Sequence, residues 1–263
     1  MLDATVNVWR WRRVVGAVAR RELKARYAGS ALGAAWTVLE PAVQFGLYLT
    51  VFSYFLGMRL ESNPTVGSFG FFLLGGMIPF GAFQEALVRA LGLARSQAGL
   101  VRHLNTPLEV LLAGSLVAIF VRHAVALILA TALAVIWGTV AWAGLPWLAL
   151  GLVLLCVGTW GLALLLAPAG AFLPDLGQAV GSAMMVLFFL TPVVYPLDRV
   201  PAPAARLLAC NPLIGLLETF RALLVGTRVA PERIAVSAAA ALVALAVGSL
   251  VFAKRAAAVP DVI

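Results

Sequence analysis

The chain has 263 residues, of which 63% are hydrophobic and 11% are charged, and its mean hydropathy is +1.02. Too few polar residues remain to cover a soluble globule, so the composition predicts an integral membrane protein. The net charge of +8 does not indicate nucleic acid, because a cluster of Lys and Arg between Arg10 and Arg26 directly precedes an apolar stretch. That arrangement is typical of positive charge on the cytoplasmic side of a membrane.

Residues 6–27 are predicted to form an amphipathic helix at the cytoplasmic membrane surface. Trp11, Val14 and Val18 recur near helical spacing, while arginines occupy another face. This basic N-terminus lacks the apolar core of a cleavable signal peptide, so we expect it in the mature protein. We assign residues 1–33 to this interface helix, whose cations can meet anionic membrane lipid or a cytoplasmic partner.

The rest of the chain is predicted to form a six-span bundle. Backbone groups in lipid must be hydrogen-bonded within their own segment, so the spans should be helices and the fold all-α. The chain would be a single transmembrane domain, 1–263, with a bundle at 34–253 and a cytoplasmic tail at 254–263. The spans are expected at residues 34–56, 68–91, 112–140, 146–170, 178–197 and 234–253. Six spans and the basic N-terminus place both termini in the cytoplasm.

Two connections between spans have helical character of their own. Residues 92–107 form a cytoplasmic loop that contains Arg95 and Arg102 and follows Arg89, and these three arginines could dock a partner on that side of the membrane. Residues 197–233 contain two apolar–polar segments, 204–209 and 213–225, after a proline-rich stretch. We expect these two segments to be short helices at the outer membrane surface.

Four sequence motifs occur in a fixed order along the chain. The first runs from Arg26-Tyr27 through Ser30, Leu32-Gly33, Trp36 and Leu39 to Pro41; the others are Asn105-Thr106-Pro107-Leu108-Glu109, the run Phe188–Pro196, and Asn211-Pro212-Leu213 followed by Arg221. Together they resemble the polysaccharide-export permeases among the type 2 ABC transporters. The resemblance covers nearly the whole chain.

This resemblance implies a homodimer that moves a lipid-linked polysaccharide, of O-antigen or capsular type, across the bacterial inner membrane. It also implies two copies of a separate ABC ATPase subunit, which would bind ATP and Mg while this chain binds no cofactor. The alternative is a type 2 ABC exporter of teichoic acid, lipid or drug with the same architecture. An enzyme or a secondary transporter is disfavoured, because no catalytic cluster and no inverted repeat is visible in the sequence.

The sequence predicts that ATP hydrolysis is not performed by this chain. Its two lysines, Lys24 and Lys254, do not follow glycine in a GxxxxGK[ST] phosphate loop. His103 and His123 have no companions at metal-ligand or triad spacing, so neither a metal site nor catalysis is expected. The resemblance implies that the interface helix and the loop helix contact the ATPase, and the residues expected there are Arg20, Lys24, Arg95, Arg102 and His103.

Polar residues inside the predicted spans are candidate functional groups, because ionisable side chains in a membrane are costly. The first span contains Glu40 and Gln44, one helical turn apart, the second contains Glu85, and the third contains Arg122. For Glu40, a structural role and a substrate contact are equally compatible with the pattern. Arg122 fits a structural or interfacial role better, since its side chain could snorkel to the cytoplasmic interface.

Aromatic side chains of the first and fifth spans are candidates for a sugar-conducting wall. Sugars present apolar CH faces and hydroxyls, so a conduit needs rings with a few hydrogen-bonding tips. Packing or an aromatic belt is the alternative for each ring. Tyr48 and Phe52 are the preferred lining pair among Phe45, Tyr48, Phe52, Tyr54, Phe55, Phe188, Phe189 and Tyr195.

Overall fold

A computed structural model of the chain describes residues 2–61, 63–103 and 106–259. These residues form helices and turns, and the described ranges contain no β-strand beyond an isolated bridge between Leu60 and Asn63. The all-α prediction is confirmed.

The helices follow one another as α1 (Leu2–Arg10), α2 (Arg12–Arg26), α3 (Trp36–Tyr48), α4 (Ser68–Ser96), α5 (Ala98–His103), α6 (Leu108–Ile136), α7 (Leu145–Phe172), α8 (Leu176–Leu190), α9 (Ala202–Leu208), α10 (Pro212–Val225) and α11 (Pro231–Arg255). A π-helix, η2 (Leu49–Phe55), continues α3 directly. Short 3₁₀ turns are η1 (Gly33–Ala35), η3 (Trp142–Gly144), η4 (Leu197–Arg199) and η5 (Ala256–Ala258).

Among the described residues, four helices are long and apolar enough to cross a membrane, so the chain is a multi-pass membrane protein. They are α4, α6, α7 together with the preceding turn η3, and α11. Each coincides with a predicted span. The first predicted span corresponds to α3 and η2 taken together, and the fifth to the shorter apolar helix α8 of 15 residues.

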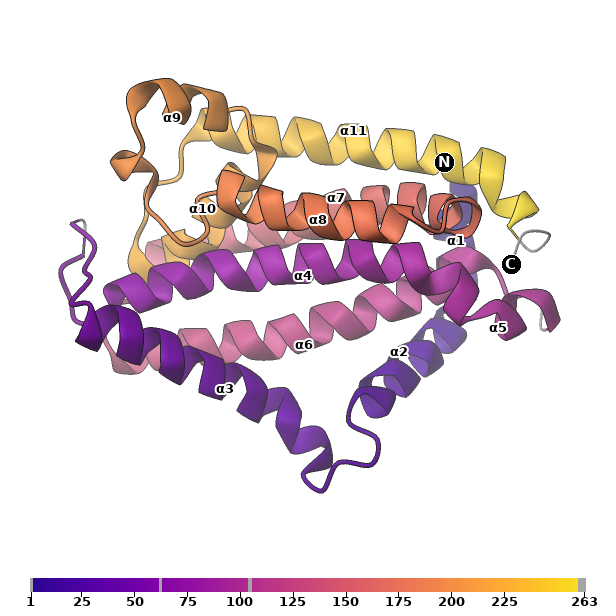
Figure 1. The fold of residues 1–263 in the computed structure, drawn as a ribbon, viewed down its shortest axis with the longest axis horizontal. Coiled ribbons are helices and arrows are strands. Elements are labelled where there is room, and N and C mark those ends of the chain that lie inside the picture. The colour runs from indigo at the N-terminus through magenta and orange to yellow at the C-terminus, as the bar shows by residue number, and fades with distance from the viewer. Residues whose placement is uncertain (1, 62, 104–105, 260–263) are drawn as a thin grey trace.

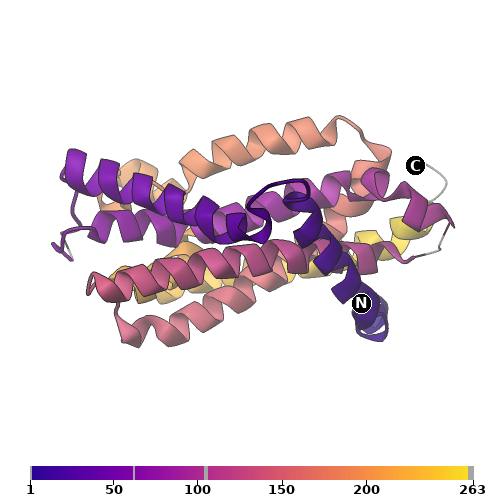
Figure 2. The same ribbon diagram turned by 90° about the horizontal axis from the view of Figure 1, so that it is seen from below.

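Helix α4 lies at the centre of the fold and packs against α6, α7 and α10 (Figures 1 and 2). It is buried along most of its length because its sides are covered by these neighbours. The most extensive contact in the chain joins α7 to α11. Gly161 of α7 lies against the backbone of Ala244 and Leu245, and Gly248 of α11 lies against the Gly161 carbonyl, so side chains at these glycines would separate the two helices.

Two helices connect α8 to α11, as the sequence predicts, but α10 lies deeper than a surface helix. All residues from Leu213 to Val225 are buried, by α4, α7 and α11. The Arg221 side chain explains this position, because it donates hydrogen bonds to the carbonyls of Phe72, Pro192 and Val193 at 2.8–3.1 Å. A buried guanidinium needs such partners, and its alkyl stem and head fit beside the bare backbone of Gly75 and Gly76.

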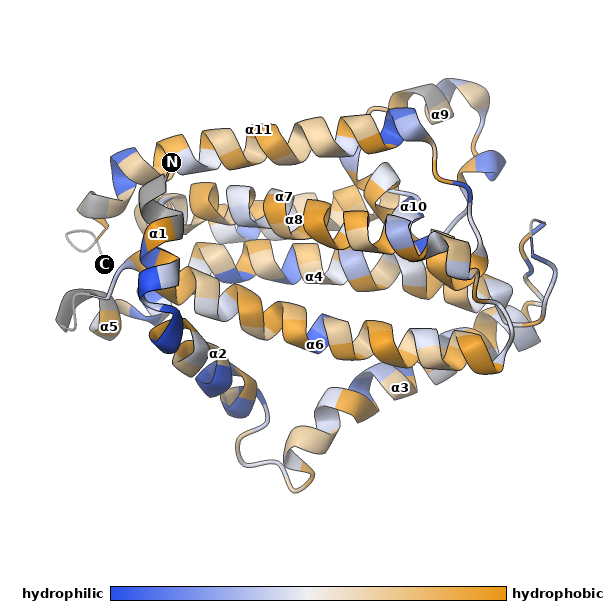
Figure 3. Ribbon diagram, turned by 180° about the vertical axis from the view of Figure 1, so that it is seen from behind, coloured by the Kyte–Doolittle hydropathy of each residue, from blue (hydrophilic) through white to orange (hydrophobic). Residues whose placement is uncertain are grey.

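Helices α3 and α8 are the least enclosed apolar helices of the bundle. Figure 1 shows α2 and α3 meeting at a sharp turn, with α3 leaning away from the other long helices. In that turn Gly29 and Gly33 adopt φ values of +81° and +48°, as expected for glycines that permit a tight reversal. Apolar side chains on α3 and α8 remain exposed, and they include Val38, Val43, Leu47, Met185, Val186 and Leu190. Hydrophilic residues are instead concentrated on α1 and α2, as Figure 3 shows.

Candidate functional site

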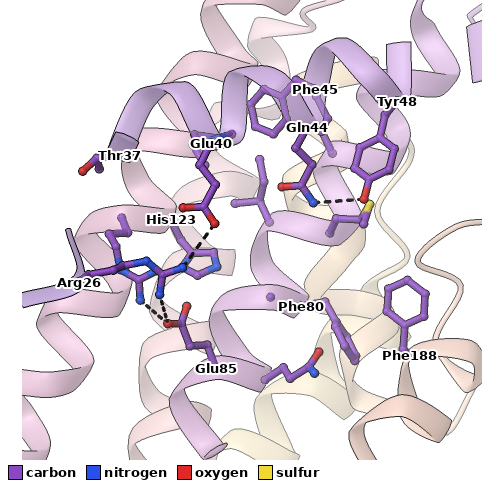
Figure 4. Close-up of a pocket in the computed structure, with 18 of the residues that line it drawn as sticks. Arg26, Thr37, Glu40, Gln44, Phe45, Tyr48, Phe80, Glu85, His123 and Phe188 are labelled. Atoms are coloured by element: carbon purple, nitrogen blue, oxygen red, sulfur yellow. Dashed lines mark hydrogen bonds and ion pairs between the residues drawn. The ribbon is translucent and has the colours of Figure 1, made fainter. Parts of the chain in front are cut away.

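A cavity of about 270 Å³ opens where α3 leans away from α4 and α6, with α8 contributing Phe188 to its wall. Its lining brings together residues from the α2–α3 junction to α8 that are far apart in the sequence. Figure 4 shows that charged side chains gather at one end and aromatic side chains at the other.

The charged end of the cavity is a network of two arginines and two glutamates. Arg26 pairs with Glu40 and Glu85, each at 3.4 Å (Figure 4). Glu85 also pairs with Arg122. The Tyr27 hydroxyl donates to the second oxygen of Glu40 at 3.1 Å. Four elements, namely the end of α2, α3, α4 and α6, therefore meet through side-chain charges.

These ion pairs differ in burial, and hence in their energetic weight. The Arg122 side chain is only 14% exposed, whereas the side chains of Arg26 and Glu40 are 40% and 53% exposed. Solvent screening leaves an exposed pair worth little, but a buried arginine depends on its carboxylate. Burial opposes the charge on Arg26, yet the Tyr27 hydroxyl and the two carboxylates outweigh it and raise the pKa of Arg26.

The other end of the cavity combines rings with neutral hydrogen-bonding groups. Gln44 donates to the Tyr48 hydroxyl at 3.1 Å, and both side chains line the cavity. Phe80 and Phe188 meet edge to face with centroids 5.3 Å apart. Flat apolar rings beside amide and hydroxyl groups suit a ligand with apolar faces and many hydroxyls.

The structure brings seven of the sequence-predicted candidates into this single cavity. All four polar residues predicted to lie within the spans line it, as do three of the aromatic residues: Glu40, Gln44, Glu85, Arg122, Phe45, Tyr48 and Phe188. Their convergence makes this cavity the candidate site.

The remaining aromatic candidates lie outside the cavity lining. Phe52 packs between Tyr48 and Phe69, with ring centroids 6.3 and 5.9 Å away. Phe55 is 77% exposed on η2, where Tyr54 is exposed as well, and Phe189 is exposed on α8. The Tyr195 hydroxyl donates to the Phe189 carbonyl at 2.6 Å, which ties the turn after α8 back to that helix.

The candidate ATPase-contacting residues lie apart from the cavity. Arg20 and Lys24 are exposed on α2, as a docking role would require. Arg95 at the end of α4 donates to the Ala171 carbonyl at 3.0 Å, so it also joins α4 to α7. The backbone of α5 is helical to His103, but the side chains of Arg102 and His103 lie outside the described part of the structure.

Sequence reasoning missed the polar contacts that hold α2 in place. Glu22 accepts from Arg89 at 2.5 Å and from Ser115 at 2.6 Å, which joins α2 to α4 and α6. Asn7 of α1 donates to Glu109 of α6 at 2.9 Å. The only available signal was a glutamate within a basic helix, which does not identify its partners.

His123 and Phe80 are further cavity-lining residues that the sequence did not single out for this site. The ring of His123 is hydrogen-bonded to the Ile119 carbonyl at 3.0 Å, one turn earlier in α6. Within the described residues, no group of three or more His, Cys, Asp or Glu side chains could hold a metal ion.

Comparison with known proteins adds a family and several relatives. Residues 13–225 match the ABC-2 type transporter family. The O-antigen export system permease protein RfbA of Myxococcus xanthus is 27% identical over 260 residues, which cover 97% of both chains. The polysialic acid transport protein KpsM of Escherichia coli is 26% identical over 211 residues, or 79% of both chains. RfbA of Klebsiella pneumoniae is 23% identical over 241 residues, or 90% of both chains.

Proposed function

Because the chain belongs to the ABC-2 type transporter family, we propose that it moves a lipid-linked polysaccharide, of O-antigen or capsular type, outward across the bacterial inner membrane. The chain is a permease, and ATP hydrolysis in this family belongs to a separate subunit. The names of its relatives favour polysaccharide over teichoic acid, lipid or drug as the cargo.

The proposed transporter contains two copies of this chain and two ATPase subunits, which bind ATP and Mg. Each permease would have six spans, with α3–η2 and α8 as the first and fifth, and both termini in the cytoplasm. The exposed cations of α2 and the short helix α5 are the proposed ATPase contacts. Closure of the ATPase dimer would then act on the permease from the cytoplasmic side.

The poorly enclosed helices support the proposal of a conduit between two copies. Helix α3 exposes Val43 and Leu47, and α8 exposes Met185 and Val186, although their neighbours α4 and α7 are well packed. Exposed apolar faces in a membrane protein meet lipid or another protein. A second copy placed against α3 and α8 would enclose these faces and leave the cavity on the inner wall.

The cavity between α3, α4, α6 and α8 is the observation that carries the proposal. It brings rings and neutral hydrogen-bonding groups together, which suits a sugar chain that slides over many weak contacts. A drug or lipid site would have a predominantly apolar wall. Here Gln44, Tyr48 and Gln84 share the wall with Phe80 and Phe188.

Deletion of the gene tests this function directly. We expect the deletion strain to lose a surface glycan, and a plasmid copy of the chain together with its neighbouring ATPase to restore it. Surface glycan is measured by extraction and gel electrophoresis, and permease abundance by immunoblot. An unchanged glycan profile in a strain without a second permease of this kind would refute the proposal.

A further inference from the structure

Three long stretches of this chain, which include α3 and α8 of the proposed conduit, contain neither lysine nor arginine. Residues 27–58, which include α3 and η2, contain neither lysine nor arginine, and the same holds for residues 123–198, which include α7 and α8. On α4, the stretch 68–88 that faces the cavity contains none either. All lysines and arginines therefore lie outside these three stretches, and many of them lie in the N-terminal segment between Arg10 and Arg26.

Two arginines do line the cavity, but both already form ion pairs with carboxylates. Arg122 pairs with Glu85, and Arg26 lies 3.4 Å from both Glu40 and Glu85. The four formal charges cancel. An acidic ligand would have to displace a carboxylate from arginine and leave it close to the ligand's own negative charge.

The most exposed charge of the cavity is negative. The Glu40 side chain is 53% exposed, more than any other member of the network. Pores for anions are commonly lined by rings of arginine or lysine, because a charge inside a membrane needs compensation. Since a second copy of the chain would contribute the same α3 and α8, dimerisation adds no cation from these helices.

Neutral hydrogen-bonding groups are present instead. Gln44, Gln84 and the Tyr48 hydroxyl both donate and accept hydrogen bonds, and Phe80 and Phe188 add flat apolar surface. Sugar hydroxyls need both donors and acceptors, and sugar CH faces need rings. These groups recognise hydroxyls without recognising charge.

We infer that the exported glycan is built from uncharged sugars and that the conduit disfavours acidic glycans. This inference rests on the proposed function and specifies its substrate class. The names of the relatives leave the point open, since one is a polysialic acid transport protein and others are O-antigen export permeases. The distribution of charge in this chain favours an uncharged glycan.

Analysis of the glycan that disappears on gene deletion tests the inference. We expect its repeat units to lack uronic acid, sialic acid and phosphate, and at least nine-tenths of it to pass an anion-exchange column unretained at low salt. Retention of the lost glycan on the column would overturn the inference and leave the proposed function standing. Loss of no glycan would overturn the proposed function, and the inference with it.

A binding measurement tests the same point on the protein itself. The permease in nanodiscs would be probed by saturation-transfer NMR with a dextran oligosaccharide and with an oligosialic acid of equal length. We expect the dextran probe to give at least a threefold larger signal than the oligosialic acid. This difference should shrink in Gln44→Lys, which adds a positive charge to the cavity. It should persist in the control Gln44→Met, because methionine is uncharged and similar in size to glutamine. Gln44 is exposed, so both variants should fold.

The outcomes of this measurement separate the two claims. An equal or larger signal from oligosialic acid with the unaltered chain would overturn the preference for uncharged glycans. Signal from neither probe would count against the cavity as a glycan site and therefore against the proposed function.

Discussion

Replacing Glu85 by alanine should destabilise the chain far more than the same change at Glu40. Glu85 is the partner of Arg122, whose side chain is 14% exposed, so its loss leaves a mostly buried guanidinium without a carboxylate. Breaking such a pair costs about 3–5 kcal/mol. Glu40 pairs with Arg26 at 3.4 Å with both side chains well exposed, and such pairs contribute about 0–1 kcal/mol.

The assay is unfolding of the purified permease in mixed micelles of mild detergent and SDS, followed by circular dichroism. A double variant, Glu85→Ala with Arg122→Leu, completes a thermodynamic cycle and should recover much of the loss, because no unpaired charge remains. If unfolding proves irreversible, the order of the unfolding midpoints is compared instead. Equal destabilisation by Glu85→Ala and Glu40→Ala, or a double variant as unstable as the sum of its two single variants, would refute the reasoning.

Three further changes test other parts of the structure. Tyr48→Ala should reduce glycan export at unchanged permease abundance. The control Leu207→Ala, at a side chain that is 79% exposed on α9, should leave export near normal. Equal export by both variants would return Tyr48 to a packing role. Arg102→Glu should reduce co-purification of the ATPase with the permease at least fivefold, whereas the control Arg59→Glu should not reduce it. If Arg102→Glu leaves the amount of co-purified ATPase unchanged, docking through α5 is contradicted. Arg221→Leu should destabilise the fold by about 3 kcal/mol or more, because it leaves buried carbonyls without their donor, and micelle unfolding would measure the loss.

The sequence predicts the long helices well because one physical requirement determines them. An apolar segment in lipid must satisfy its own backbone hydrogen bonds, so apolar length alone predicts a helix. Predicted spans at 68–91 and 146–170 correspond to α4 at Ser68–Ser96 and α7 at Leu145–Phe172. Helix α4 extends beyond its predicted span to Ser96, because polar residues such as Arg95 can continue a helix.

The π-helix η2 and the depth of α10 depend on tertiary contacts and could not be predicted in this way. Apolar periodicity does not distinguish a π-helix from an α-helix over the seven residues of η2. Helix α10 has the alternating pattern of a surface helix, yet Arg221 finds its carbonyl acceptors in α4 and in the turn after α8. Those acceptors are distant in sequence, so the pattern of α10 alone contains no sign of its burial.

The candidate site was partly predictable from the apolar segments that predict the spans. Composition identifies which polar side chains lie within apolar segments, and Glu40, Gln44, Glu85 and Arg122 all line the cavity. The pairs that Glu40 and Glu85 form with Arg26 and Arg122 were not predictable, because they depend on how α2, α3, α4 and α6 are placed relative to one another. The residue that joins the network, Arg26, belongs to a segment that sequence alone places at the membrane surface.

The contacts on either side of the Gly29–Gly33 turn differ, and this bears on how force from an ATPase would reach the cavity. Before the turn, Glu22 joins α2 to α4 and α6 through the short contacts with Arg89 and Ser115. After it, the ion pair that holds α3 at this end is the longer and more exposed one between Glu40 and Arg26, the last residue of α2. Solvent-exposed pairs break at little cost, whereas less exposed ones resist separation. A force on α2 should therefore move α2 together with α4 and α6, and the cavity should change width at α3, with the glycine turn as the hinge.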